Sequence, residues 1–262
     1  MALPPTPGFE LIRGNRPLLL SLPHDGCEAP PGFAVRLTPE AARLPDTDWH
    51  VARLYDFAVG QGASVLRPRY TRYLIDLNRP PDDAPLYPGQ NGTGLCPLRR
   101  FDGGPIYRDG MAPDAGERQH RVATYWQPYH AALADELERL HRLHGRVVLW
   151  EGHSIRSECP LLFEGRLPDL NLGCVDGRSC SPALRERLAA VLAGQDRFSH
   201  VIDGRFKGGY ITRHYGQPQR SVEAVQLEIA QCAYMDEATF EYREDLAERV
   251  RPILLRLFEV CL

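Results

Sequence analysis

Two histidines stand close behind apolar runs that are typical of buried strands. Residues 146–150 form one such run, and the polar segment 151–157 that follows it contains His153. Residues 18–22 form a second run, with His24 just beyond its end. Because ligands of open α/β sheets sit outside the carboxyl ends of strands, both imidazoles can share one rim of a sheet. Histidine is the commonest metal ligand in proteins, so this pattern indicates a divalent-metal site.

A third protein ligand is needed, because a catalytic zinc usually has three of them and one open position. A His-x-x-Glu spacing from His24 would require glutamate at the position of Cys27, and Glu28 lies one residue too far along. Asp48, at the start of a predicted helix, is the better candidate, although an acid there can also serve as a helix cap. Asp25 and Glu28 remain the alternatives.

One glutamate stands inside an apolar strand pattern. Glu228 belongs to the run 222–229, in which polar residues alternate with apolar ones, and Gln226 points to the same face. A buried carboxylate is costly unless it is paired or functional, and a desolvated glutamate has a raised pKa that suits proton transfer. Glu228 is therefore either a general base or a salt-bridged core residue.

Cationic and amide groups are available to bind an anionic substrate. Asn78 and Arg79 follow residues 73–77, which read as a strand, and the forked guanidinium of arginine matches a carboxylate. Lys207 is the only lysine of the chain, which is either an accident or a sign that a planar guanidinium does not fit there. The other candidates are Arg72, Arg156 and Arg213.

The elements that must position these residues alternate along the chain. Strands are predicted at 18–22, 63–66, 73–77, 146–150, 200–203 and 222–229. Helices are predicted at 48–59, 127–143, between Ser181 and Gly194, and at 237–258. This alternation predicts an α/β fold with a mixed, mostly parallel central sheet and helices on both faces. Residues 1–262 are expected to form a single domain with a long Pro/Gly-rich loop excursion at about 80–118.

Composition narrows the function classes. The 262 residues are 43% hydrophobic and 25% charged, as in a globular protein with a full core, and the net charge of −3 gives no basis for binding nucleic acid. Neither a signal peptide nor an apolar run long enough to cross a membrane is present in the sequence. Seven scattered cysteines fit a reducing compartment. We therefore expect a cytoplasmic protein, a monomer or small homo-oligomer, with a small-molecule partner.

Taken together, these segments resemble the N-formylglutamate amidohydrolases, also called N-formylglutamate deformylases, of bacterial histidine breakdown. The resemblance covers nearly the whole chain, and its specificity comes from many modest motifs that occur in order. The motifs are residues 21–26 (SLPHDG), 44–50 (LPDTDWH), 71–79 (TRYLIDLNR), 150–157 (WEGHSIRS), 168–173 (PDLNLG), 176–178 (DGR), 204–216 (GRFKGGYITRHYG) and 226–228 (QLE).

The resemblance implies a zinc-dependent hydrolase with a core similar to that of zinc carboxypeptidases and aspartoacylases. In that pattern His24, Asp48 and His153 would be the ligands of Zn²⁺ or another divalent metal, with Asp48 the least direct match. Glu228 resembles the late strand glutamate that acts there as general base and acid. The implied reaction is hydrolysis of N-formyl-L-glutamate to L-glutamate and formate.

The resemblance also suggests roles for the cationic residues. Asn78 and Arg79 look like the Asn-Arg pair that binds substrate carboxylate in the carboxypeptidases. Arg79 and Arg213 could hold the two carboxylates of the substrate, with Asn78 and Lys207 as helpers. A guanidinium, either Arg72 or Arg156, could stabilise the developing oxyanion.

Three rival functions remain open. The first is a sister amidohydrolase of the same fold that acts on another N-acyl amino acid. The second is a metal-free cysteine amidase in which His153 activates Cys159 or Cys27. The third is a binding protein without catalysis, which would have no need of a proton-transferring Glu228.

Overall fold

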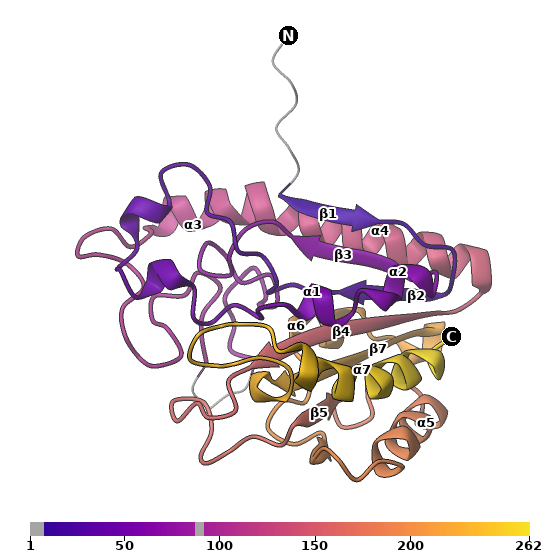
Figure 1. Cartoon of the computed structure of the whole chain (residues 1–262). Helices are drawn as coiled ribbons and strands as arrows, with labels where there is room; N and C mark the ends of the chain where they lie inside the picture. The colour runs from indigo at the N-terminus through magenta and orange to yellow at the C-terminus, as the bar shows by residue number, and fades with distance from the viewer. Residues whose placement is uncertain (1–7, 87–91) are drawn as a thin grey trace.

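A seven-stranded sheet runs through the centre of the molecule, in the order β1-β3-β2-β4-β7-β5-β6 (Figure 1). The computed structural model describes residues 8–86 and 92–262. The strands are β1 (Phe9–Ile12), β2 (Leu18–Ser21), β3 (Ser64–Pro68), β4 (Val147–Ile155), β5 (Leu170–Gly173), β6 (His200–Ile202) and β7 (Val222–Ala230). β3, β2, β4 and β7 are mutually parallel, whereas β1 pairs antiparallel with β3 and β5 antiparallel with β7. The sheet is therefore mixed and mostly parallel, as predicted.

Helices cover both faces of this sheet (Figure 1). The α-helices are α1 (Val51–Leu54), α2 (Phe57–Gly60), α3 (Ala115–Arg121), α4 (Gln127–His144), α5 (Pro182–Ala193), α6 (Tyr210–Tyr215) and α7 (Glu244–Glu259). On one face, α4 packs Leu133, Leu137 and Leu140 against the sheet. On the other face, α5 and α7 contribute Leu188 and Leu254 to the larger core. The α/β fold with helices on both faces is confirmed.

Short helical turns complete the described part of the chain. Four of them are 3₁₀ turns and one is a π-helical stretch. They are η1 (Ala34–Arg36), η2 (Ala41–Arg43), η3 (Val122–Trp126, the π-helical stretch), η4 (Pro218–Arg220) and η5 (Gln231–Ala233).

Side chains of β4 alternate between the two faces, and this alternation carries the polar residues. Leu149 packs on the α4 side and Trp150 on the α7 side. By the same period of two, Glu151 and His153 continue the α4-side row toward the carboxyl end of the strand. The strand was predicted to end at Trp150. In the structure it continues through His153 to Ile155. Buried polar side chains can continue a strand when each has a partner, as both do here.

Capping signals located two helices correctly. The helix predicted at 127–143 is α4, and Gly145 ends it with a positive φ of 71°. The helix predicted between Ser181 and Gly194 is α5, whose first turn is capped by Ser181, an acceptor from the Leu184 N–H. The strands predicted at 18–22, 63–66, 200–203 and 222–229 are β2, β3, β6 and β7 within one or two residues at their ends.

The strand predicted at 73–77 is wrong, because this segment forms turns. Its apolar side chains are buried against different neighbours: Tyr73 packs in a cluster with Phe33, while Leu77 packs on the α4 side of the sheet. An apolar run can thus anchor a buried loop as well as a strand, so Asn78 and Arg79 follow a loop and not a strand end.

Two predicted helices are shorter than expected. The helix predicted at 48–59 is divided into α1 and α2. The C-terminal helix predicted at 237–258 begins only at Glu244. Before it, the Asp236 side chain accepts bonds from the Ala238 and Thr239 N–H groups, and Phe240 adopts a positive φ of 62°. These local bonds hold the segment in a turn.

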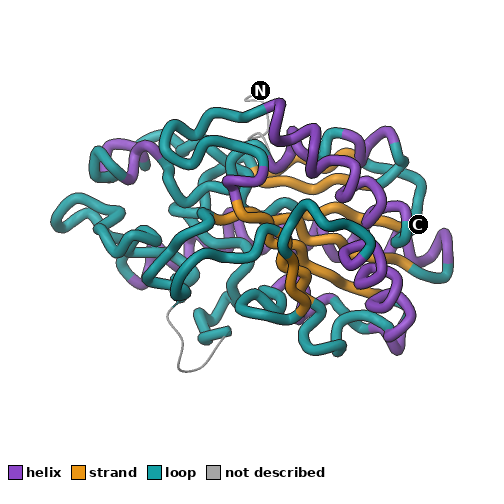
Figure 2. The backbone as a smooth tube through the Cα atoms, turned by 60° about the horizontal axis from the view of Figure 1, so that its bottom comes forward, coloured by secondary structure: helices purple, strands orange, loops and turns teal. Residues whose placement is uncertain are grey.

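Long loops gather at the carboxyl ends of the parallel strands (Figure 2). Within the predicted excursion at 80–118, the described residues form turns and isolated bridges until α3 begins at Ala115. Residues 87–91 of this excursion lie outside the described part of the chain. Among the described helices, none combines the length and apolar character needed to span a membrane.

Candidate active site

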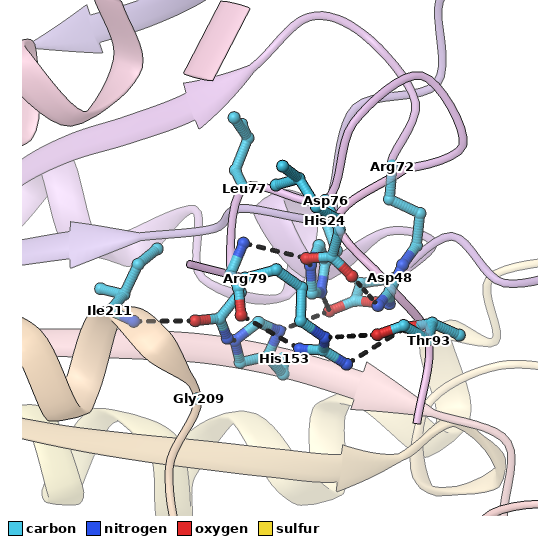
Figure 3. A network of polar contacts seen from close by, with 12 residues as sticks. His24, Asp48, Arg72, Asp76, Leu77, Arg79, Thr93, His153, Gly209 and Ile211 are labelled. Carbon is cyan, nitrogen blue, oxygen red and sulfur yellow. Dashed lines mark hydrogen bonds and ion pairs between the residues drawn. The ribbon is translucent and has the colours of Figure 1, made fainter. Parts of the chain in front are cut away.

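His24, Asp48 and His153 come together at the carboxyl edge of the sheet (Figure 3). His153 lies on β4, His24 follows β2, and Asp48 lies in the turn before α1. One candidate ligand atom from each residue lies within 4.8 Å of the others, and all three side chains are buried. The structure therefore brings together the three residues that were predicted from the sequence to be metal ligands.

The two alternative acids lie apart from this cluster. Asp25 accepts a bond from the Ala52 N–H at 3.3 Å and pairs with Arg67 at 3.6 Å. Glu28 is exposed and pairs with Arg69 at 3.5 Å. Asp48 is the acid that faces both histidines.

Each histidine is held at its Nε2 atom by a second buried carboxylate. Asp76 Oδ1 lies 2.6 Å from His24 Nε2, and Glu151 Oε1 lies 2.7 Å from His153 Nε2. Both Nδ1 atoms then face Asp48 Oδ2, at 3.8 Å for His24 and 3.0 Å for His153. A carboxylate behind each imidazole is the arrangement that orients histidine ligands toward a metal.

The donor set fits a divalent cation. Asp48 Oδ2 accepts the Ser154 N–H at 3.1 Å, but Asp48 Oδ1 is buried and accepts no hydrogen bond among the described residues. Arg72 lies 3.6 Å from this oxygen. Two imidazole nitrogens that face one buried carboxylate are a set of ligand atoms that zinc accepts.

Charges in this cluster oppose one another. Burial alone would lower the pKa of His153, but Glu151 and Asp48 outweigh it and raise that pKa well above its usual value. The pKa of His24 is lowered, because burial and the charge of Arg72 act in the same direction. Burial would raise the pKa of Asp48, but the bond to His153 and nearby cations lower it. A positive charge is therefore stabilised between His153 and Asp48, where a metal ion can replace a proton.

Glu228 faces the same space from β7. It is paired in register with His153 on the neighbouring strand, and it lines the cavity that adjoins the cluster. Burial raises the pKa of Glu228 to about 8, although the charges of His153 and Arg72 oppose the shift. A carboxyl group with such a pKa gains and loses its proton near neutral pH, as a general acid–base requires.

A cavity adjoins the cluster and opens to solvent. Its lining combines charged, amide and apolar side chains, as the lining of a small-molecule site does. His24, His153 and Glu228 form part of its lining, and Arg72 and Arg79 line it from the segment that follows β3. Catalytic candidates and cationic groups therefore border one space.

Arg72 and Arg79 are held differently within this lining. Arg72 is buried and donates from Nη2 to Asp76 Oδ2 at 2.7 Å, which balances its charge inside the protein. Arg79 donates to main-chain and hydroxyl oxygens, namely Thr93 O at 2.9 Å, Asn78 O at 3.0 Å and Thr93 Oγ1 at 3.2 Å (Figure 3).

Asn78 is bound by the protein at both ends of its amide. Its Nδ2 donates to Glu151 and lies 3.1 Å from His153 Nε2, while its Oδ1 accepts the Ile211 N–H at 2.9 Å. A Cβ atom at Gly209 would lie 2.2 Å from Asn78 Nδ2, so only glycine allows this close approach. Asn78 thus links Glu151, the carboxylate behind His153, to the start of α6.

The segment 76–79 is fixed by two aromatic side chains of the neighbouring helix. His130 Nε2 donates to Leu77 O at 2.9 Å, and Trp126 Nε1 donates to Arg79 O at 2.9 Å. The indole and imidazole rings stack with centroids 3.7 Å apart. The backbone around Asn78 is therefore clamped on both sides.

The stacked pair lies where the helix geometry changes. The π-helical stretch Val122–Trp126 runs directly into α4, and such stretches often occur at functional sites. Burial lowers the pKa of His130 to about 3, so the ring is neutral and can donate from Nε2 while Nδ1 lies 3.0 Å from the Tyr215 hydroxyl. No pattern in the sequence indicated this role for His130.

Three predicted substrate-binding residues are not among the described residues that line the cavity. Arg156 donates to Glu237 O at 2.7 Å, and Arg213 Nε donates to Gly208 O at 2.9 Å. Lys207 pairs with Asp176 at 2.8 Å. The structure therefore brings together His24, Asp48, Arg72, Asn78, Arg79, His153 and Glu228, but not these three.

Two carboxylates of the site, Asp76 and Glu151, were missed as functional residues. Both lie in motifs that carried the family resemblance, and a spacing signal was available for one of them. Glu151 stands two residues before His153, so the period of two puts both on one strand face. Asp76 precedes Asn78 by two residues, but its segment is a loop, where no such periodicity applies.

The two cysteines of the rival amidase mechanism, Cys27 and Cys159, do not suit a thiol nucleophile. Burial raises the pKa of Cys159 to about 11, and its Sγ faces Phe101 O at 3.6 Å. Burial and nearby acids also raise the pKa of Cys27. A nucleophilic cysteine requires a lowered pKa, so both thiols are in the wrong environment.

Comparison with known proteins agrees with this geometry. Residues 16–235 match the family model described as N-formylglutamate amidohydrolase. The chain belongs to the N-formylglutamate amidohydrolase family. An N-formylglutamate deformylase of Pseudomonas aeruginosa is 56% identical over 94% of this chain and 93% of the relative. One from Pseudomonas putida is 50% identical over 95% of this chain and 94% of the relative. The resemblance drawn from the motifs is confirmed.

Solved structures support the fold of this N-formylglutamate amidohydrolase family member. The crystal structure of an N-formylglutamate amidohydrolase from Ralstonia eutropha superposes with a TM-score of 0.82 at 27% identity, covering 97% of both chains. A gene product of Agrobacterium tumefaciens gives a TM-score of 0.68 at 17% identity over 97% of this chain and 96% of that one, which is a likeness of fold alone.

Proposed function

We propose that this chain is a metal-dependent N-formylglutamate deformylase, which converts N-formyl-L-glutamate and water into L-glutamate and formate. The observation that carries the proposal is the position of Glu228 beside the buried cluster of His24, Asp48 and His153, at a cavity that Glu228 and both histidines line. The family membership and the names of the Pseudomonas relatives support the substrate. The reaction would belong to histidine degradation.

His24, Asp48 and His153 would hold the ion, Zn²⁺ or another divalent metal. Such an ion supplies Lewis-acid polarisation of the formyl oxygen and makes a nearby water more acidic. Asp76 and Glu151 keep the two imidazoles oriented, so the ligand atoms are in place before the ion binds.

Glu228 performs the proton transfers. It takes a proton from the water that attacks the formyl carbon, so that a C–O bond forms. When the C–N bond breaks, Glu228 gives this proton to the departing amine nitrogen, and formate and L-glutamate are left. Its buried position on β7, in register with His153 of the candidate metal cluster, supports this role.

Arg72 and Arg79 provide positive charge in the lining of the same cavity. Arg72 is held rigidly by Asp76, so it can stabilise negative charge that develops on the formyl oxygen without reorganising. Arg79, with Asn78 beside it, binds a substrate carboxylate and fixes the scissile bond near Glu228. Binding roles for Arg156, Lys207 and Arg213 stay predictions, as do a cytoplasmic location and a monomeric or small homo-oligomeric state.

A formate-release assay tests the proposal. The purified chain is expected to release formate from N-formyl-L-glutamate and to be inhibited by a chelator but not by a thiol alkylator. N-acetyl-L-glutamate and N-formyl-L-aspartate serve as comparison substrates. Faster hydrolysis of another N-acyl amino acid would indicate the sister amidohydrolase, and activity that only the alkylator abolishes would indicate the cysteine amidase.

A further inference from the structure

A third arginine lines the cavity, and no part of the proposed mechanism uses this arginine. Among the described lining residues, the arginines are Arg72, Arg79 and Arg205. Arg72 is bound by two buried acids, Asp76 and Asp48, so its charge is balanced within the protein. Arg79 and Arg205 are the other two arginines of this lining.

Arg205 is oriented by its own surroundings. It follows β6, and its Nε donates to Leu162 O at 2.8 Å. The guanidinium carbon lies 5.2 Å from the centroid of the Phe206 ring. Leu162 and Phe206 also line the cavity, so Arg205 lies beside apolar side chains of the lining. An arginine beside such side chains is suited to bind a carboxylate in a fixed orientation.

Arg79 and Arg205 border different parts of the cavity. Arg79 follows Asn78, which lies 3.1 Å from His153 Nε2 in the metal-site cluster. Arg205 follows β6, and the strand order puts β7 and β5 between β6 and the strand of His153. Because adjacent strands are about 4.8 Å apart, the loop that carries Arg205 leaves the sheet three strands away from β4, the strand of His153.

The spacing of charges in the substrate matches this separation. In N-formylglutamate the α-carboxylate is one carbon away from the scissile amide nitrogen, while the side-chain carboxylate lies two methylene groups further out. An α-carboxylate near the metal-site cluster can meet Arg79. The side-chain carboxylate then extends toward the strand end at which Arg205 stands. A desolvated dianion needs a cation at each end.

We propose that Arg205 binds the side-chain carboxylate of the substrate and makes the site selective for N-acyl amino acids with an acidic side chain. Arg79 binds the α-carboxylate, which every N-acyl amino acid carries. This inference rests on the proposed deformylase function. It assigns Arg205 a role in discrimination, whereas Arg79 contributes to binding whatever the side chain is.

The test compares kcat/KM for N-formyl-L-glutamate and N-formyl-L-glutamine, which differ only in the charge of the side chain. In Arg205→Gln the value for the glutamate substrate is expected to fall by about 10- to 100-fold, as loss of a charged hydrogen-bonded pair implies. The value for the glutamine substrate is expected to change by less than about threefold. Arg79→Gln is expected to lower both values. Arg197→Gln, an exposed arginine before β6, serves as the matched control.

Several outcomes overturn the selectivity role. Equal losses on both substrates in Arg205→Gln, or no loss on either, would do so. If that variant folds poorly, Arg205→Lys gives the second test, because it keeps the charge and loses the fork. Its preference for glutamate is expected to fall but to remain, and an unchanged preference overturns the proposal. Failure of the unaltered protein to release formate from either substrate would instead reject the deformylase function, and the selectivity role with it.

Discussion

His153 on β4 and Glu228 on β7 are register partners in two adjacent parallel strands, so the imidazole and the carboxylate lie side by side on one face of the sheet. The imidazole belongs to the candidate metal site, and the carboxylate lines the cavity beside it. Strand pairing thus sets the distance between the candidate metal site and the proposed general base. Sites built on strands keep such distances better than sites built on loops.

Replacement of the general base separates chemistry from binding. Glu228→Gln keeps the size and burial of the side chain but cannot accept a proton. We expect kcat to fall by roughly 10²–10⁴ while the metal content stays unchanged. Steady-state kinetics and elemental analysis of the same preparation measure both. Glu259→Gln, an exposed glutamate at the end of α7, is the control, and full activity of Glu228→Gln would exclude the base role.

The carboxylates behind the imidazoles should tune metal affinity. Asp76→Asn and Glu151→Gln remove the negative charge beside His24 and His153 without shortening the side chain. Each change is expected to weaken metal binding by about 10- to 100-fold. Competition with a chromophoric chelator measures this, with the exposed Asp109→Asn as control. An unchanged dissociation constant in both variants would contradict the orienting role.

The hydrogen bond from the Trp126 indole to the main chain of Arg79, a proposed substrate-binding residue, should affect KM. Trp126→Phe keeps an aromatic ring to stack on His130 but removes the donor to Arg79 O. We expect KM to rise about fivefold, with kcat within about twofold and metal content unchanged, because one neutral hydrogen bond is lost. Trp150→Phe is the matched control, since it loses an indole bond to Tyr55 on the opposite face. Equal KM changes in the two variants would show a general loss of stability instead.

Buried neutral His130 makes stability depend on pH. The pKa of its ring is lowered to about 3 in the folded protein, below the usual value near 6.5 of the unfolded chain. Between these values the unfolded chain binds a proton that the folded chain does not, so stability falls as the pH falls below 6.5. From pH 7 to pH 5 the contribution of His130 amounts to about 2 kcal/mol.

Urea unfolding at several pH values measures this dependence. His130→Gln retains a donor for Leu77 O but cannot titrate, so its free energy of unfolding should depend less steeply on pH between 5 and 7. Neighbouring His214 also lowers the pKa of His130, so His214→Gln is expected to change the slope only slightly. Identical slopes for the unaltered chain and His130→Gln would contradict the assignment.

Much of the site was predictable because strand patterns leave a clear trace in the sequence. The strand before His153, and the alternation that places Gln226 and Glu228 on one face, follow from a period of two. His24 stands out because a strand ends just before it. Helix α4 was predictable from its apolar stripe and from Gly145 at its end.

Other parts could not be read from local patterns. The run 73–77 is apolar because its side chains anchor a buried loop, a tertiary effect that looks like a strand in sequence. β1 and β5 were not predicted, because neither of these four-residue strands has the continuous apolar run that marks β2. Arg205 reaches the cavity from a loop after β6, and no spacing rule connects it to His153.

Metal content measured together with turnover tests the central claim most directly. The purified full-length chain is expected to bind about one divalent ion per molecule, to lose formate release when a chelator removes it, and to regain activity with Zn²⁺. His24→Ala and His153→Ala should lose metal and activity together. Full hydrolysis of N-formyl-L-glutamate by metal-free protein, or by either variant, would contradict the account.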